Sequence, residues 1–589
     1  MNPSRASSEE AGLALLAVLF ALTLLMLLAL PFAVSMGVGA DAAARDAEAT
    51  MVEQASASVR EILLDDATLS HPSIDPTPMF DGRDEFPQAL EVPKAFEGLR
   101  DEGRVLLGGS VVDAQRFLGL DGASPLLFAN ALGLTTRLRE DLKPEDQVVQ
   151  LEQAEALPDS GHVFVGGELI QYTEKDGSTL KGLTRGLLAL EQGFANGQQA
   201  IRADALVLDY RCVLAAAWPF LGHDPARKTR RPYRAVGDLI AVADAGYGAF
   251  TSAELDTLRR LFTVDTMATS AATWGRPERV FNDLEAGKSR TLLVRSALHV
   301  GAGSTVRLRN LASGEVEYGL VAATSTTRGI PNLQLRVVFQ LHLLLPVVAG
   351  FVGTDTVVEP LIPAPVNVNT ADADVLTAIC SHIRVAADVR VHDGQQQGTS
   401  PRWVRPNEAL QLAQDVLALR GDGMPAGSQA PGQGPLTGWK DLVERVLQPR
   451  LDAASGVPQK QPWVYLYRNL QTGRDSALEM GTAPIVFQSG PWVNYRAAAS
   501  RSRSIVAPGV VGRHERTGQA AALPGFLLQR AWKTQEMLEE AFTLDRRAPF
   551  WTTLPVNLGH PVPIDVGNDP APRYFPHLVP VAYPEMGFG

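Results

Sequence analysis

The feature that most constrains this chain is an uncharged apolar run close to its N-terminus. From Ala11 to Ala40 the sequence carries no Asp, Glu, Lys, Arg or His. A helix needs about 20 consecutive apolar residues to cross the hydrocarbon core of a bilayer. A cleaved secretory signal, the alternative, has a shorter apolar core of about 7–15 residues. The length of the run therefore favours a membrane-spanning helix over a signal peptide.

The helical pattern continues beyond this run as an amphipathic stem. Glu53, Arg60 and Glu61 lie off an apolar stripe with helical spacing. The stripe consists of Met51, Ala55, Val59, Ile62 and Leu63. Pro31 removes one backbone donor, which predicts a kink. We expect one N-terminal helix over residues 13–65, with its first part in the membrane.

A short polar leader, Gly12 and an uncharged helix that becomes an amphipathic stem together resemble the type IV pilin and pseudopilin class. In that class a prepilin peptidase cuts after the glycine, and the new N-terminus is methylated. The resemblance implies that Leu13 is the first mature residue and Ala17 the fifth. The leader departs from the class at Glu9 and Glu10, where Lys or Arg is usual.

The fifth mature position narrows the resemblance. Most members of the class carry Glu there, which neutralises the amine of a neighbouring subunit, whereas this chain carries Ala17. An unpaired carboxylate in lipid costs a few kcal/mol, so a subunit without one needs no neighbour above it. The tip subunit, the K-type minor pseudopilin of the general secretion pathway, is known for this absence. The resemblance implies that this chain is such a tip subunit.

The stretch PVNVNTADADVLTAI predicts a short strand, a turn and a helix. Asn369 or Thr370 is expected to cap the helix by accepting a free backbone N–H. Leu376, Ile379 and Ile383 are expected to form its buried face. The K-type family carries an N-x-N-T-A turn, which in this chain is formed by Asn367, Val368, Asn369, Thr370 and Ala371.

Two further helices are predicted after this turn. Asn407 is expected to cap the first of them, which extends to Arg420 and stops at Gly421. The second begins near Trp439. K-type proteins show the same order of turn and helices, and the resemblance therefore implies an inserted helical domain.

The same turn occurs in DNA-uptake proteins of the helix-hairpin-helix type, which follow it with a Gly-x-Gly hairpin that binds phosphate. Here no glycine follows Leu376 until Gly394. The net charge is -12 and the pI about 5.4, so the chain has no basic excess for nucleic acid. We expect no nucleic-acid binding, and a membrane-anchored DNA-uptake receptor is the less favoured alternative.

Alternating apolar and polar residues predict β structure between the stem and the helical domain. The segment 159–186 is expected to form a hairpin around an Asp-Gly turn. The segment 313–329 repeats its Gly-Glu, Tyr and Thr-Arg-Gly order and suggests a divergent repeat. Strands are also expected within 491–511. Thr251 and Glu254 form a capping box that predicts a helix to Phe262.

The sequence favours a protein without enzymatic activity. Gly287-Lys288-Ser289 resembles the end of a phosphate-binding loop, but Asn282 occupies the position where that loop needs glycine. We expect a solvated turn there instead. His382 and Cys380 lie two residues apart on a predicted helix and hence on different faces, which does not suit a nucleophile and its base. His382 is expected to be a partly exposed helix residue.

Metal and disulfide chemistry remain open at two sets of residues. K-type helical domains are thought to bind calcium, and Asp415, Asp422 and Asp441 are the candidate ligands. No D-x-[DN]-x-[DN]-G loop surrounds them, so solvated carboxylates are favoured. The two cysteines, Cys212 and Cys380, are compatible with a disulfide or with two buried thiols. No other cofactor is expected.

Together these patterns and the resemblance imply an α+β protein. It combines a transmembrane and stem helix with a pilin-like β-sheet head, which carries inserted β modules and an inserted SAM-like or helix-hairpin-like helical domain. The expected segments are a prepilin-type leader (1–12), the transmembrane helix and stem (13–65), the first part of the periplasmic head (66–132), a β-rich insertion (133–210), a head segment with a helix (211–275), a second β-rich insertion (276–360), the helical domain (361–450), a C-terminal β segment (451–530) and an irregular tail (531–589).

The function that the resemblance implies is that of a minor pseudopilin at the tip of a type II secretion pseudopilus. Such a protein acts by assembly with other minor pseudopilins through its stem. Its further partners are the prepilin peptidase and the inner-membrane platform of the secretion system. It is a single-pass protein of the bacterial inner membrane with its bulk in the periplasm. A minor pilin of a type IV pilus is the related alternative.

Processing gives the first test. Gly12→Val should block cleavage, because the peptidase must accommodate a backbone without side-chain bulk at this position. N-terminal sequencing of the membrane fraction should find Leu13 first in the wild type and an uncleaved leader in the variant. A mature protein that begins after Ala40 would contradict the prediction.

Overall fold

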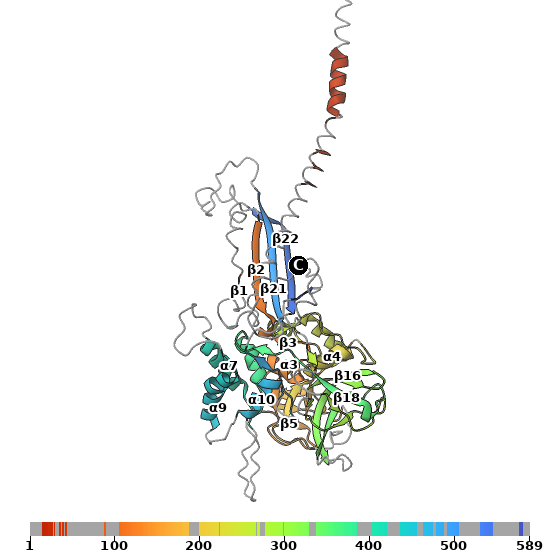
Figure 1. Ribbon diagram of the computed structural model, residues 1–589, viewed down its shortest axis with the longest axis vertical. Coiled ribbons are helices and arrows are strands. Elements are labelled where there is room, and N and C mark those ends of the chain that lie inside the picture. The colour runs from red at the N-terminus through yellow and green to blue at the C-terminus, as the bar shows by residue number, and fades with distance from the viewer. Residues whose placement is uncertain are drawn as a thin grey trace, which may run out of the picture. The chain divides into compact units, whose positions relative to one another are not determined.

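A computed structural model of the chain is shown in Figure 1. The structure describes residues 15–27, 29, 35–36, 38–39, 42–43, 88–89, 105–187, 200–222, 224–264, 266, 268–270, 277–297, 300–328, 337–385, 402–420, 436–455, 463–474, 479–487, 492–505, 531–545 and 577–580. Helices and several separate sheets are both present, and the α+β class predicted from the sequence is confirmed.

The N-terminal apolar run contributes a helix over residues 15–27, in which every residue is exposed. No helix among the described residues is both long and apolar enough to span a bilayer. Pro31 and the stem residues from Met51 to Leu63 lie outside the described residues, so the predicted kink and stem stay predictions.

The chain divides into two compact units. The first comprises residues 1–66, 89–111 and 495–541, and the second comprises residues 67–88, 112–494 and 542–589. A five-stranded sheet in the order β1-β2-β21-β22-β23 contains the long strands of the first unit. Its strands are β1 (Gln88–Ala89), β2 (Val105–Asp113), β21 (Trp492–Ile505), β22 (Ala531–Asp545) and β23 (His577–Pro580).

This sheet confirms one prediction and corrects another. Strand β21 occupies the segment in which strands were expected. The irregular tail predicted for 531–589 is wrong in part, because Ala531–Asp545 forms β22. The sequence of β22 is rich in Glu, Met, Leu and Ala, which favour helices. Pairing with β21 and β23 overrides this local preference, as tertiary context commonly does.

The second unit is built around one large hydrophobic core. A four-stranded sheet in the order β4-β10-β6-β7 and several helices enclose this core. The strands are β4 (Thr135–Arg137), β6 (Gly161–Val165), β7 (Glu168–Tyr172) and β10 (Leu206–Asp209). The helical segments are α3 (Pro125–Leu132), α4 (Tyr210–Leu221), η2 (Val236–Ala245) and α5 (Ser252–Leu261). The predicted capping box is confirmed, since the Thr251 hydroxyl accepts from the Glu254 N–H and the Glu254 carboxylate accepts from the Thr251 N–H.

The segment 159–186 forms two hairpins rather than one. The first joins β6 to β7 through Gly166 and Gly167, whose φ angles are 57° and 91°. The second joins β8 to β9 at the predicted Asp-Gly turn, where Gly177 has a φ of 58°. Both turns need the left-handed backbone region that glycine adopts at no steric cost. The second hairpin belongs to a three-stranded sheet of β5 (Val148–Gln150), β9 (Thr179–Lys181) and β8 (Glu174–Asp176).

Six strands of the second unit close into a barrel. They are hydrogen-bonded in the order β13-β18-β15-β16-β17-β14, and a bridge between Val280 and Val294 joins the two ends. Closure removes the unpaired strand edges that an open sheet would present. The strands are β13 (Glu278–Arg279), β14 (Thr291–Val294), β15 (Thr305–Asn310), β16 (Val316–Arg328), β17 (Val337–Leu343) and β18 (Thr356–Ile362). A short strand, β12 (Thr269–Ser270), also pairs with β18.

The barrel has a hydrophobic core of its own, separate from the main core. Successive residues of β16 point to opposite faces of the sheet, and they divide between the two cores accordingly. Val321 lies in the barrel core, whereas Leu320 and Ala322 belong to the main core. A buried ion pair between Arg227 and Glu317, with 2.7 Å from a guanidinium nitrogen to a carboxylate oxygen, also links β16 to the segment after α4.

The divergent repeat suggested by the sequence is wrong. The segment 159–186 contains two hairpins, whereas 313–329 contributes one long strand, β16, that pairs with β15 on one side and β17 on the other. The shared Gly-Glu, Tyr and Thr-Arg-Gly order therefore occupies different structures. The predicted solvated turn at Gly287 is confirmed, since Lys288 is exposed and forms an ion pair with Glu285, three residues earlier in the same turn.

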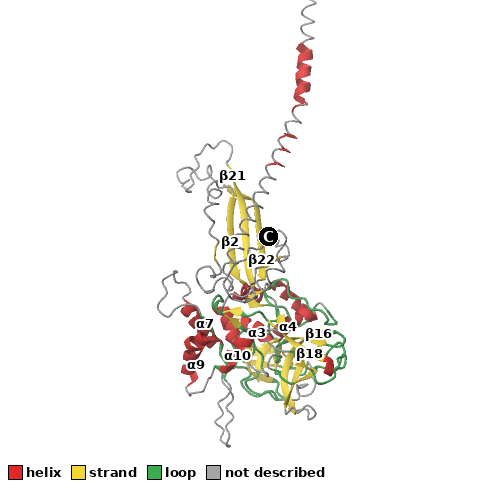
Figure 2. Cartoon of the chain, viewed as in Figure 1, coloured by secondary structure: helices red, strands yellow, loops and turns green. Residues whose placement is uncertain are grey.

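Helices gather on the side of the second unit away from the barrel strands β16 and β18 (Figure 2). They are α6 (Ala373–Cys380), α7 (Pro406–Arg420), α8 (Trp439–Leu442), α9 (Gln448–Ser455) and α10 (Val464–Thr472). A π-helical segment over Val443–Leu447 connects α8 to α9, and the predicted helix start near Trp439 is confirmed. Two short parallel pairs complete the unit, namely β3 (Leu118–Gly119) with β11 (Phe262–Thr263) and β19 (Val366–Asn367) with β20 (Ile485–Val486).

The barrel core gives a test of stability with a matched control. Leu308 is fully buried in that core, whereas Leu311, just beyond the same strand, is 52% exposed. Leu308→Ala should lower the free energy of opening of the barrel by about 2–5 kcal/mol, because it leaves a cavity. Leu311→Ala should change it by less than about 0.5 kcal/mol. Hydrogen exchange of barrel peptides measures both, and equal effects would contradict the assignment of the core.

Candidate functional site

The turn predicted from the sequence follows the short strand β19. Its backbone N–H groups from Val368 to Ala371 all donate hydrogen bonds to other residues of the chain. Asn367, the last residue of β19, organises it. The Asn367 side-chain oxygen accepts from the Asn369 N–H at 3.0 Å, and its carbonyl accepts from the N–H groups of Thr370 and Ala371 at 3.2 and 2.9 Å. The Val368 N–H donates to the Val486 carbonyl at 2.9 Å. These amide groups are therefore not available to a phosphate.

The carboxamide of Asn369 connects the turn to two distant segments. Its nitrogen donates to the carbonyls of Leu436 and Phe487 at 2.9 and 2.8 Å, and its oxygen accepts from the Leu436 N–H at 2.9 Å. The side chain is buried, with Asn369 only 4% exposed. Both ends of one amide thus satisfy backbone groups that burial would otherwise leave unpaired.

Arg420, the last residue of α7, holds the turn from the other side. Its guanidinium donates to the carbonyls of Val368 and Ala371 at 2.8 Å each, and it is 4% exposed. A charged donor strengthens such bonds. The turn residues and Arg420 therefore form a buried joint between β19, α6 and α7.

Both capping predictions for this region are wrong. Helix α6 begins at Ala373 after Asp372, so neither Asn369 nor Thr370 caps it, and no side-chain cap is present. The Asn369 carboxamide instead forms hydrogen bonds with the backbone of Leu436 and Phe487. Helix α7 begins at Pro406, which places Asn407 inside the first turn rather than at the cap. Proline suits this first position because its missing N–H would have no helical partner there.

The calcium candidates are engaged with arginines or lie outside the described residues. Asp415 pairs with Arg450 at 2.7 Å, and Asp441 pairs with Arg445 at 3.0 Å. Asp422 lies outside the described residues. Among the residues that the structure describes, no group of three or more His, Cys, Asp or Glu side chains is placed to hold a metal ion.

Both cysteines are buried free thiols, Cys212 on α4 and Cys380 at the end of α6. Burial raises the pKa of each thiol, to about 12 for Cys380, so neither forms the reactive thiolate.

His382 is not the partly exposed helix residue that was predicted. It lies beyond the end of α6, is 8% exposed and has a φ of 59°.

Of the N-terminal site residues, the structure describes one. Ala17 lies in the exposed helix of residues 15–27. Gly12 and Leu13 lie outside the described residues, and their roles in processing stay predictions.

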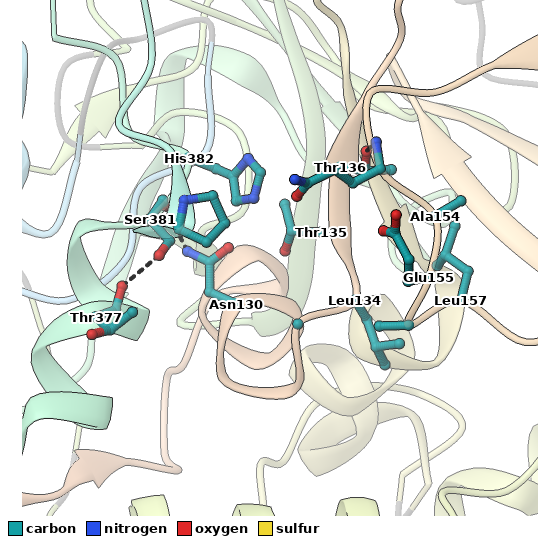
Figure 3. Close-up of a pocket in the computed structure, with 14 residues that line it drawn as sticks. Asn130, Leu134, Thr135, Thr136, Ala154, Glu155, Leu157, Thr377, Ser381 and His382 are labelled. Atoms are coloured by element: carbon teal, nitrogen blue, oxygen red, sulfur yellow. Dashed lines mark hydrogen bonds between the residues drawn. The ribbon is translucent and has the colours of Figure 1, made fainter. Parts of the chain in front are cut away.

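A pocket of about 220 Å³ lies next to the turn-bearing helix α6 (Figure 3). Its lining comes from the end of α3, from β4, from the loop that carries Glu155, from the end of α6 and from the start of α7. The polar side chains in its lining include Asn130, Thr135, Thr136, Ser381 and His382.

The Asn130 carboxamide is oriented by the end of α6. Its nitrogen donates to the carbonyls of Ala378 and Ser381 at 2.9 and 2.7 Å, which satisfies carbonyls that a helix end leaves open. Its oxygen is buried and has no hydrogen-bond partner, and the same holds for the hydroxyl of Thr135. Such buried unpaired groups are uncommon in native proteins.

The imidazole of His382 stays neutral beside these groups. Burial, together with the nearby positive charge of Arg137, lowers the pKa of His382 to about 3. The Arg137 guanidinium donates to the His382 carbonyl at 2.8 Å and stacks over the ring of Trp403. The backbone of His382 also donates to the Val404 carbonyl at 2.8 Å.

Sequence reasoning did not single out Asn130 or Thr135. Each occupies an ordinary position for its residue type, near a helix end and in a strand. Their importance arises only where α3 and β4 meet the end of α6, about 250 residues further along the chain. No local motif marks that meeting.

No protein-family model, no curated protein and no solved structure matches the chain.

The joint at Asn369 gives a pH-dependent prediction. In Asn369→Asp, a carboxylate would face the two carbonyls that now accept from the amide, so its pKa in the folded state should rise above the unfolded value of about 3.9. The variant should be destabilised by about 3 kcal/mol at pH 7. The penalty should disappear as the pH falls below the unfolded pKa, because the protonated acid can donate.

Urea denaturation at about pH 3 and pH 7 measures this difference. Asn407→Asp is the matched control, because Asn407 is exposed in the first turn of α7, where a carboxylate is favoured by the helix dipole. The control should lose no stability at pH 7. Equal stability of the two variants at pH 7 would contradict the role of Asn369.

Proposed function

We propose that this protein is a minor pseudopilin of the K type, which forms the tip of a type II secretion pseudopilus and acts in protein secretion by assembly. The observation that carries the proposal is the helix of residues 15–27, in which every side chain is exposed and none is charged. A folded chain does not leave such a surface in water. Lipid and the stems of other subunits would cover it in the assembled filament.

The exposure of this helix is large along its whole length. Ten of its side chains are large and apolar and are more than half exposed, namely Leu15, Leu16, Val18, Leu19, Phe20, Leu22, Leu24, Leu25, Met26 and Leu27. They lie all around the helix rather than along one stripe, because they include consecutive residues. A helix that is apolar on all sides is typical of a membrane environment. We therefore infer that the helix continues along the uncharged run as an inner-membrane anchor.

The helical region adds a second line of support. The K-type resemblance rests in part on the N-x-N-T-A turn, and Asn367, Asn369 and Arg420 make this turn a buried structural joint. A joint of this kind suits a rigid head that works by shape. A DNA-uptake receptor is disfavoured because the phosphate-binding Gly-x-Gly hairpin is missing after the turn, where no glycine follows Leu376 until Gly394. We infer a head without enzymatic activity, held in the periplasm by the N-terminal helix.

Crosslinking in cells tests the proposed assembly. A photoreactive residue at Leu19, which is 57% exposed, should crosslink to other minor pseudopilins and to the inner-membrane platform. The same probe at Leu308, in the barrel core, is the control and should yield no such product. Crosslinks to pilins of a type IV pilus instead would identify the related alternative. Absence of any filament subunit among the products would contradict the proposal.

The tip position gives a separate prediction at Ala17. Ala17→Glu would place a carboxylate where a tip subunit has no amine above it, at a cost of about 2–3 kcal/mol or with a protonated side chain. Incorporation into the filament and secretion should therefore fall or stay unchanged. Ala17→Leu, which keeps the position apolar, should assemble as the wild type does.

Quantitative immunoblots of sheared filaments and assays of secreted protein measure both variants. Improved incorporation of Ala17→Glu would indicate an ordinary shaft subunit, whose fifth-position carboxylate pairs with a neighbour. That result would contradict the tip assignment while leaving the filament assignment in place.

A further inference from the structure

We propose that the pocket between α3, β4 and the end of α6 binds a neutral primary carboxamide, the group carried by glutamine and asparagine. The proposal does not depend on the function proposed above. It rests on the hydrogen-bonding groups that the pocket presents, on the charges around it and on its size.

The first group is the oxygen of the Asn130 carboxamide. Both donated bonds of Asn130 go to the carbonyls of Ala378 and Ser381, and these bonds fix which way the amide points. Its oxygen is left buried and without a partner. Because a carboxamide oxygen can only accept, a ligand must offer an N–H or O–H group to it.

The second group is the hydroxyl of Thr135. Thr135 is 7% exposed, and its hydroxyl is also without a partner. Figure 3 shows Thr135 and the Asn130 carboxamide next to each other in the pocket wall, with Ser381 on the other side of Asn130. Two unpaired polar groups around one cavity are a costly arrangement unless something fills it.

The third group is the imidazole of His382. In its neutral form one ring nitrogen donates and the other accepts. The backbone of His382 is held by bonds to Val404 and Arg137, and the residue is part of the pocket wall. A ligand that complements all three groups therefore needs donors and an acceptor close together. A primary carboxamide has two N–H donors and one carbonyl acceptor.

The charges around the pocket disfavour ionised ligands of either sign. The carboxylate of Glu155, an exposed residue in the lining, opposes an anion. The Asn130 oxygen opposes a carboxylate as well, because both are hydrogen-bond acceptors and neither has a proton to donate. The guanidinium of Arg137, which contacts the backbone of His382, opposes a cation. A neutral group is therefore preferred.

The size of the pocket limits the ligand to one such group and a short stem. Sites for drug-sized ligands occupy about 300–1,000 Å³, whereas this pocket measures about 220 Å³. Leu134 and Leu157 line its apolar part and would contact the methylene groups of a glutamine side chain. The ligand is either free glutamine or a glutamine side chain on another protein, and both present the same group.

Ligand-observed NMR titrations of the full chain with four capped amino acids test the proposal. N-acetyl-glutamine methylamide should bind at least about tenfold more tightly than the corresponding derivatives of glutamate, lysine and norleucine, because these lack a donor, lack an acceptor or carry a charge. Free glutamine is a fifth probe. Binding of free glutamine as tight as that of the capped form would indicate a free amino acid as the ligand, and tighter binding of the capped form would indicate a protein side chain.

A pair of variants separates a binding role from a structural one. Thr135→Val removes the unpaired hydroxyl and keeps the shape, so it should weaken glutamine binding about 2- to 10-fold without lowering the melting temperature. Thr305→Val is the matched control. Thr305 is 1% exposed on a barrel strand, its hydroxyl is also unpaired, and it lies outside the pocket lining. This control should leave glutamine binding unchanged.

Three results would overturn the proposal. The first is no detectable binding of any amide probe at about 50 mM, which would mean that water alone fills the pocket. The second is equal binding of the glutamine and norleucine derivatives. The third is a Thr135→Val variant that binds glutamine as the wild type does.

Discussion

The buried carboxamide of Asn369 is the contact on which the helical half of the second unit depends. It satisfies backbone groups of Leu436 and Phe487, and so joins the turn both to the segment before α8 and to the residue after β20, a strand that already pairs with β19. Arg420 adds its guanidinium to the same turn from the end of α7. Because buried amides and carbonyls are costly without partners, loss of this one side chain would leave several groups unsatisfied at once. Asn369 thus fixes the segment before α8 at the turn, and Arg420 fixes the end of α7 there.

Much of the local structure could be predicted from the sequence, because its causes are local. The capping box of Thr251 and Glu254 predicted the start of α5, and the sequence also predicted the helix that ends at Arg420 and the helix that begins near Trp439. The barrel could not be predicted in the same way. Its closure depends on Val280 meeting Val294 and on β18 pairing with both β13 and β15. Such pairings are set by packing between distant segments, and β22 shows that they can override a helix-favouring composition.

The candidate site shows the same division. The turn was recognised from its sequence, yet Asn369 does not cap the following helix. Its carboxamide instead bonds to the backbone of Leu436 and Phe487, which are distant in the sequence and close in the fold. The pocket was missed altogether. Asn130 meets Ser381 across 251 positions of the chain, and an unpaired hydroxyl such as that of Thr135 is a property of the folded surroundings rather than of the sequence.

The order of strands in the five-stranded sheet has a consequence for the route by which the chain folds. Neighbouring strands β2 and β21 are separated by residues 114–491, which include the main core and the barrel. The ribosome therefore synthesises residues 114–491 after β2 and before β21, the strand with which β2 pairs. The main core, whose last member is Phe487, can form before β21 has been synthesised and therefore while β2 has no β21 to pair with. Pairing over such long sequence separations is slow, so the sheet is the last element of the fold to close, and nascent β2 needs protection from wrong partners until then.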